Sequence, residues 1–141
     1  MIAMFHWIEV RAFCHATEEE ERVVAALRTV MREGEFRREK LEGHFGNPLL
    51  VLKARAEGAQ AMAVWSRLVA VIGKDEALGD LEERLDDEGV YHLRIDKQKA
   101  FLGEIGKASS EDVISLRAKV AAFPNRRDVA VEVLRRSVEA V

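Results

Sequence analysis

The sequence predicts an α+β fold in which a mixed, largely antiparallel sheet is covered by helices on one face. Stretches that alternate between apolar and polar residues, the period of a strand, are interspersed with stretches whose apolar residues recur every three or four positions, the period of a helix. The chain has 141 residues, 48% of them hydrophobic and 33% charged. This length and composition favour a single folded domain over residues 1–141 and exclude a disordered chain.

Alternating patterns predict strands at five places. These are residues 4–15, 35–42, 49–57, 90–96 and 112–123. In the first strand, the alternation assigns His6 and Ile8 to the core and Phe5 and Trp7 to the opposite face. The second strand is mostly charged, so we expect it at an edge of the sheet.

Helical spacing predicts four helices. They cover residues 17–34, 59–73, 76–88 and 125–141. Thr17 with Glu20 and Asn125 with Asp128 have the spacing of capping boxes, so Thr17 and Asn125 are expected to cap the first and last helices. The segment 97–106 is expected to be a connection with one helical turn, because glycines at its end interrupt it.

The helices must bury their apolar stripes on one face of the sheet, which leaves the other face open. The alternation predicts that this open face combines aromatic and cationic side chains. They are Phe5, Trp7, Arg11, Phe13, Lys53, Arg55, His92, Arg94, Arg117 and Lys119. Rings that stack on bases, set among cations that contact phosphate, are typical of single-stranded RNA binding. The same aromatic residues are equally consistent with a homodimer or an adaptor that docks on another protein.

The net charge of −3 argues against nucleic acid only until the charges are located. Residues 18–21 and 74–89 together carry −10, which leaves +7 on the rest of the chain. We therefore expect these two acidic stretches to lie away from Arg94, Lys119 and Arg126.

Two further places are candidates for RNA contact. Arg126 and Arg127 stand at the predicted start of the last helix, where exposed amides and guanidinium groups favour a phosphate. The glycine-bounded turn at 43–48 contains His44 and Asn47, and functional residues favour such loops.

Catalytic motifs are not found. The sequence has no phosphate-binding loop, no Gly-x-Ser-x-Gly, no His-Glu-x-x-His and no Cys-x-x-Cys. Cys14 and His15 are neighbours in a predicted strand, so their side chains point to opposite faces and cannot form a catalytic pair or a shared metal site. The sequence therefore predicts a protein that is not an enzyme and holds no metal or cofactor. The enzymatic alternative would pair His44 with a carboxylate such as Asp96.

The cellular setting is predicted from two observations. Cys14 is the single cysteine, which excludes an internal disulfide and is typical of the reducing cytoplasm. The apolar stretches are too short or too interrupted by charge for a signal peptide or a membrane span.

Four blocks of the sequence carry a family resemblance. They are MFHWIEVRAFCHATE at 4–18, GHFGNP at 43–48, LRIDKQKA at 93–100 and KVAAFPNRR at 119–127. In order and approximate spacing, these blocks resemble the archaeal proteins called RNA-binding or predicted exosome-subunit proteins. The resemblance covers nearly the whole chain. It implies a fold like that of ribosomal protein L5 and an RNA-binding role beside the exosome or ribosomal RNA.

The resemblance also implies which polar residues contact RNA. They are Arg11, His44, Asn47, Arg94, Lys97, Gln98, Lys119, Arg126 and Arg127. This chain has Phe123 where the family has a tyrosine, so the ring can stack on a base but has no hydroxyl group to form a hydrogen bond.

Overall fold

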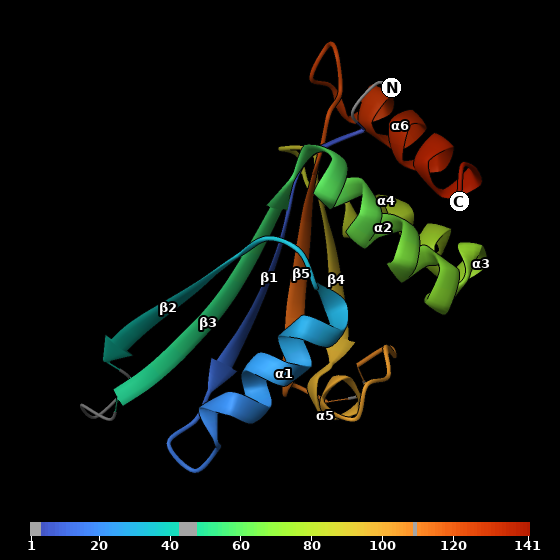
Figure 1. Ribbon diagram of the computed structural model, residues 1–141. Coiled ribbons are helices and arrows are strands. Elements are labelled where there is room, and N and C mark those ends of the chain that lie inside the picture. The colour runs from blue at the N-terminus through green and yellow to red at the C-terminus, as the bar shows by residue number, and fades with distance from the viewer. Residues whose placement is uncertain (1–3, 43–47, 109) are drawn as a thin grey trace.

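The computed structural model describes residues 4–42, 48–108 and 110–141. At its centre is a five-stranded sheet in the order β2-β3-β1-β5-β4, in which every neighbouring pair is antiparallel (Figure 1). The strands are β1 (Phe5–Cys14), β2 (Glu35–Glu42), β3 (Pro48–Glu57), β4 (Val90–Asp96) and β5 (Val113–Val120). The predicted α+β class is confirmed, and the charged strand is at an edge as expected.

The helices lie on one side of this sheet (Figure 1). They are α1 (Glu20–Val30), α2 (Gly58–Ile72), α3 (Lys74–Leu78), α4 (Leu81–Arg84), α5 (Lys97–Phe101) and α6 (Arg127–Glu139). Their apolar residues, such as Leu27, Leu68 and Leu134, join Ile8 and Leu116 of the sheet in one buried core. None of the described helices is both long and apolar enough to cross a membrane. No helix among the described residues covers the opposite face of the sheet.

Three helix boundaries differ from the sequence prediction. The first helix begins at Glu20, after an N-cap at Glu19, and Thr17 does not cap it. The helix predicted over 76–88 is two short helices, because Asp80 between them adopts a left-handed conformation with φ of 54°. The last helix begins at Arg127 instead of after Asn125, and no side chain caps it.

A bulge in β1 reverses two assignments near its start. Phe5 lies opposite Val120 and Trp7 opposite Lys119, so β1 has one extra residue, His6, between these pairs. As a result Phe5 is fully buried against Trp65, with ring centroids 4.9 Å apart, and His6 is exposed. The predictions of an open-face Phe5 and a core His6 are therefore wrong, because alternation cannot register the extra residue.

Candidate nucleic-acid interface

Side chains that face one another on neighbouring strands form transverse rows across a sheet. One row on the open face crosses all five strands and contains no acidic residue. From edge to edge it consists of Arg37, Lys53, Arg11, Ser115 and Arg94. We call these residues the basic row. With strands about 4.8 Å apart, the basic row extends over about 19 Å.

Most charges of the basic row lack an acidic partner. Lys53 lies with its Nζ 3.2 Å from a carboxylate oxygen of Glu39. The Arg11 guanidinium lies 5.7 Å from the centroid of the Phe13 ring. Among the described residues, no carboxylate forms an ion pair with Arg11, Arg37 or Arg94. Like charges placed opposite one another repel, so an anion bound along this row would stabilise it.

The adjacent row contains acidic residues and arginines in equal number. It consists of Glu35, Arg55, Glu9, Arg117 and His92. Because its two glutamates lie opposite arginines, this row has almost no net charge. The open face is therefore not uniformly basic, and its unbalanced positive charge is concentrated in the basic row.

The open face is hollowed over β1, β2 and β3. The hollow has a volume of about 890 Å³ and receives Arg37 and Lys53 from the basic row. Acidic side chains from the neighbouring positions, among them Glu9 and Glu57, also line it. The hollow is lined by four basic and four acidic side chains, so its own charge is balanced. The positive charge that remains for a ligand comes from the members of the basic row that have no described carboxylate partner.

Trp7 is less available for base stacking than the sequence suggests. It is half-buried, and the guanidinium carbons of Arg55 and Arg117 lie 4.7 Å and 5.3 Å from a ring centroid of its indole. These cation–π contacts place the two arginines over the indole surface. Lys119, opposite Trp7, donates a hydrogen bond to the carbonyl of Glu88.

One acidic side chain reaches the open face from a stretch expected to lie away from it. Asp86 Oδ2 is 2.8 Å from His92 Nε2. Partial burial would raise the pKa of Asp86, but hydrogen bonds from His92 and from the amides of Val90 and Glu88 hold it below its ordinary value. The expected separation of the acidic stretches from Arg94, Lys119 and Arg126 fails at Lys119, because its ammonium donates a hydrogen bond to the carbonyl of Glu88 within the stretch 74–89. No described carboxylate of the two stretches forms an ion pair with Arg94, Lys119 or Arg126.

Lys97, predicted to contact RNA, is instead 2% exposed at a junction of four segments. Its Nζ donates to the Phe13 carbonyl and to Glu18 Oε1, each at 2.9 Å, and lies 2.8 Å from Asp112 Oδ1. Burial alone would lower the pKa of Lys97, but hydrogen bonds to the two carboxylates outweigh it and raise that pKa. We call Lys97, Glu18 and Asp112 the Lys97 cluster. Each N–H donor of its ammonium therefore already has an oxygen of the protein as its acceptor, and none is free for a ligand.

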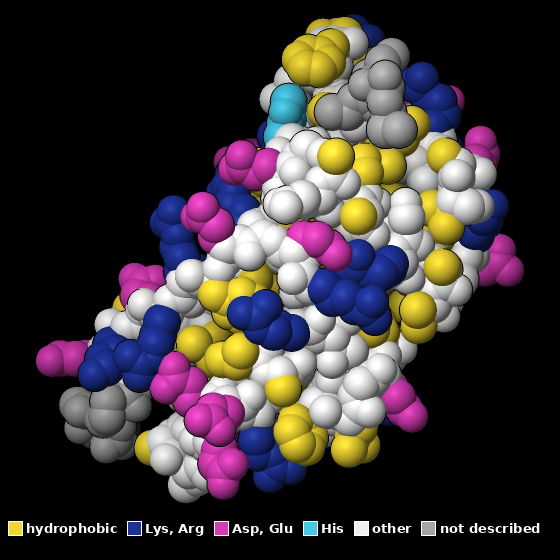
Figure 2. Space-filling view, in the orientation of Figure 1, with side chains coloured by type: hydrophobic (Ala, Val, Ile, Leu, Met, Phe, Trp, Pro, Cys, Tyr) yellow, Lys and Arg dark blue, Asp and Glu magenta, His cyan; other side chains and the backbone are white. Residues whose placement is uncertain are grey.

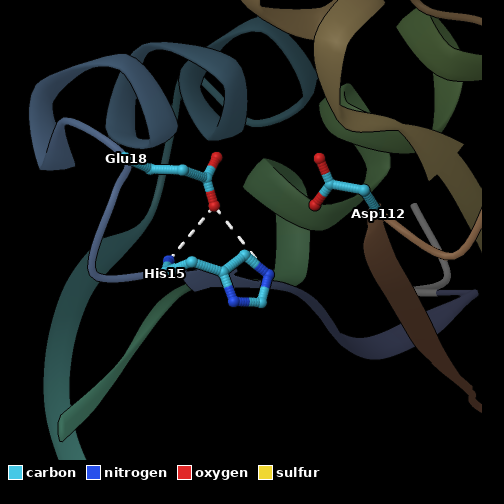
Figure 3. Close-up of side chains that lie close together, drawn as sticks. All are labelled: His15, Glu18 and Asp112. Carbon is cyan, nitrogen blue, oxygen red and sulfur yellow. Dashed lines mark hydrogen bonds and ion pairs between the residues drawn. The ribbon is translucent and has the colours of Figure 1, made fainter. Parts of the chain in front are cut away.

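The same carboxylates lie beside His15 (Figure 3). One potential ligand atom each from His15, Glu18 and Asp112 lies within 4.8 Å of the others, an arrangement that can suggest a metal site. The Lys97 ammonium pairs with both carboxylates, so a metal ion bound there would lie beside a fixed positive charge that repels it. Gln98, also predicted to contact RNA, donates a 3.2 Å hydrogen bond to Asp112 from an exposed position.

The two arginines before and at the start of α6 differ in their partners. Arg127 donates to the carbonyl of Leu85 at 2.6 Å and to that of Glu82. It therefore joins α6 to the end of α4. Arg126 has a side chain that is 64% exposed and pairs with Asp128 at 3.3 Å. Of the pair, Arg126 is the one whose guanidinium is free of backbone partners among the described residues.

Comparison with known proteins identifies the family. A family model described as RNA binding matches residues 7–120, which include every member of the basic row. The chain belongs to this RNA-binding family. It is 37% identical to RNA-binding protein PAB1135 of Pyrococcus abyssi over 95% of this chain and 94% of that protein. It also resembles the solved structure of Mth689, a DUF54 protein from Methanothermobacter thermautotrophicus, with 37% identity and a TM-score of 0.81 over 96% and 98% of the two chains.

For this member of the RNA-binding family, the structure brings Arg11 and Arg94 together in one row, with Lys119 two rows away on the same face. His44 and Asn47 lie outside the described residues. Arg126 and Arg127 lie beyond the span that the family model matches.

Sequence reasoning missed two members of the basic row, Arg37 and Ser115. Arg37 lies opposite Lys53 in the pairing of β2 with β3, and residue type alone does not give that register. Ser115 is recognisable only once β5 is known to lie between β1 and β4.

Proposed function

We propose that this protein binds RNA through the open face of its sheet, that the basic row contacts phosphate groups, and that the protein is not an enzyme. The observation that carries this proposal is the basic row itself, which crosses all five strands with three guanidinium groups that have no described carboxylate partner. Membership of the RNA-binding family and the name of the Pyrococcus abyssi relative support it.

The chemistry of the row fits a chain of phosphates. Guanidinium groups bind phosphate oxygens through paired N–H donors, and the Ser115 hydroxyl can donate a further hydrogen bond between Arg11 and Arg94. A single small anion would cover one or two of these residues, whereas a polyanion can neutralise the whole length of the row. Lys119 and Arg126 would add cations at one end of the sheet.

A second copy of the chain is a poorer occupant of this face. A two-fold contact centred on the face would bring one basic row against another, and like charges brought together without counter-charges oppose association. The structure therefore favours RNA over the homodimer that the aromatic residues alone left open.

Three of the residues that the family resemblance implies as RNA contacts are assigned other roles in this proposal. Lys97 and Arg127 join segments of the fold, and Gln98 supports the Lys97 cluster through Asp112. We expect replacement of these residues to lower the stability of the protein, and to lower RNA affinity only as a result of that loss of stability.

The experiment that tests this proposal is a salt titration of RNA affinity. Each phosphate contact contributes a slope of roughly −0.7 in log affinity against log salt for single strands. Wild-type protein is compared with Arg11→Gln and Arg94→Gln, and Arg135→Gln serves as the control because Arg135 is an exposed arginine on α6. We expect each row variant to reduce the slope by roughly 0.7 and the control to leave it unchanged. Equal slopes for all four proteins would rule out the basic row as the phosphate site.

The finer part of the resemblance, an association with the exosome or with ribosomal components, is a separate proposal. It predicts that purified exosome or ribosomal subunits retain the protein after ribonuclease treatment. Release by ribonuclease would mean that RNA alone makes the link.

A further inference from the structure

A pair of aromatic rings is exposed at one end of the sheet. The loop between β5 and α6 projects beyond that end (Figure 1) and includes Phe123, which is 78% exposed. Its ring meets the ring of His6 edge to face, with centroids 5.9 Å apart and an interplanar angle of 88°. Figure 2 shows hydrophobic and histidine side chains gathered at this end of the molecule. We call His6 and Phe123 the aromatic tip.

The backbone holds both rings of the aromatic tip in place. The bulge in β1 turns His6 outward, where a regular strand would have directed it to the core. The base of the loop is anchored because Ala121 is buried and its amide donates a 2.9 Å hydrogen bond to the carbonyl of Met4. A ring on an anchored loop loses little freedom when it binds a ligand, which favours its use as a binding surface.

Cations connect the aromatic tip to the open face. His6 precedes Trp7, which faces Lys119 across the strands. The Lys119 ammonium and the Asn125 side chain both lie beside Gly89, within 3.5 Å of the position a β-carbon would take there. Arg126 follows in the same loop, and its surface pair with Asp128 is a weak competitor for a phosphate.

We propose that the aromatic tip stacks on an unpaired nucleobase and gives the protein a preference for single-stranded RNA over duplex. This inference rests on the proposed function, since the basic row must hold the phosphates. Bases inside a duplex already stack on one another and present no face to a protein ring, whereas unpaired bases do. From Trp7, beside the tip, to Arg11 is four residues of strand, or about 13 Å, so one single strand can reach both sites.

The test compares binding of an unpaired poly-A oligonucleotide with binding of an RNA duplex at several salt concentrations. The variants are Phe123→Ala, Phe123→Leu, which keeps an apolar side chain without a ring, and Phe123→Tyr, which keeps the ring. Leu102→Ala is the matched control, because Leu102 is 73% exposed and lies outside the tip.

Base–aromatic stacking gives the expected size of the effect. We expect Phe123→Ala to weaken single-strand binding roughly 5- to 150-fold, with Phe123→Leu weakened similarly and Phe123→Tyr close to wild type. The salt slope should not change, since no cation is lost, and duplex affinity should stay constant. Leu102→Ala should bind both RNAs like wild type.

Three results would overturn this inference. The first is unchanged single-strand affinity of Phe123→Ala. The second is wild-type affinity of Phe123→Leu, which would mean that an apolar contact without a ring is enough. The third is an equal loss of affinity for duplex and single strand. The proposed function is judged separately by the salt slopes of Arg11→Gln and Arg94→Gln. If those variants have a reduced salt slope and the Phe123 variants bind like wild type, the basic row is supported as the phosphate site and only the role of the aromatic tip is rejected.

Discussion

The Lys97 cluster and the basic row place cations in opposite surroundings. Lys97 is buried and has three oxygen acceptors within 2.9 Å, whereas Arg11, Arg37 and Arg94 have no described carboxylate partner. The first cation is fully used by the fold, and the others are available to a ligand. Residue type alone does not separate these roles. The roles are distinguished by the number of hydrogen-bond acceptors around each cation. Three substitutions test that distinction.

The largest effect is expected at Lys97. Lys97→Met leaves Glu18 and Asp112 facing each other without a counter-charge, and removing one partner of a buried ion pair typically costs 3–5 kcal/mol. Asp112 is 39% exposed, so we expect a loss near the lower end, about 3 kcal/mol of unfolding free energy. Urea denaturation measures it. Unchanged stability together with weaker RNA binding would mean that Lys97 contacts RNA and does not stabilise the fold.

A smaller effect is expected at Arg127. Arg127→Ala removes two hydrogen bonds from a charged group to the carbonyls of Glu82 and Leu85, and we expect a loss of roughly 1–2 kcal/mol. Arg126→Ala is the control and should change stability by less than about 0.5 kcal/mol. Thermal unfolding of the two variants side by side compares them. Equal stabilities would show that Arg127 does not join α6 to α4.

The smallest effect, with the opposite sign, is expected in the basic row. Arg11→Gln relieves repulsion between neighbouring cations, so the free RNA-less protein should be unchanged or more stable by up to about 0.5 kcal/mol. The same variant should bind RNA more weakly. Urea denaturation without RNA measures the first effect, and a destabilised Arg11→Gln would mean that Arg11 also serves the fold.

The sheet was largely predictable because its alternation is regular. Strand 90–96 was placed with its observed bounds, and Arg11, Arg94 and Arg117 were assigned to the face on which they lie. The alternation failed at Phe5 and His6, because a bulge shifts the period by one residue and leaves no signal in residue type.

The site was predictable only in part, because neighbours across strands depend on register. Lys97 resembles a surface lysine in sequence, and its burial depends on Glu18 and Asp112, which come from distant segments. The capping prediction at Thr17 failed nearby, where Glu18 contacts the His15 amide and Lys97 instead. The likeness to ribosomal protein L5 stays a prediction.

The position of β1 in the sheet has a consequence for synthesis of the chain. β1 is the first strand to be made, yet it lies between β3 and β5, and its pairing with β5 joins Trp7 to Lys119. Until β5 has left the ribosome, one hydrogen-bonding edge of β1 is open, and unpaired strand edges promote aggregation. That edge of β1 therefore stays without its partner until most of the chain, up to β5 (Val113–Val120), has been made.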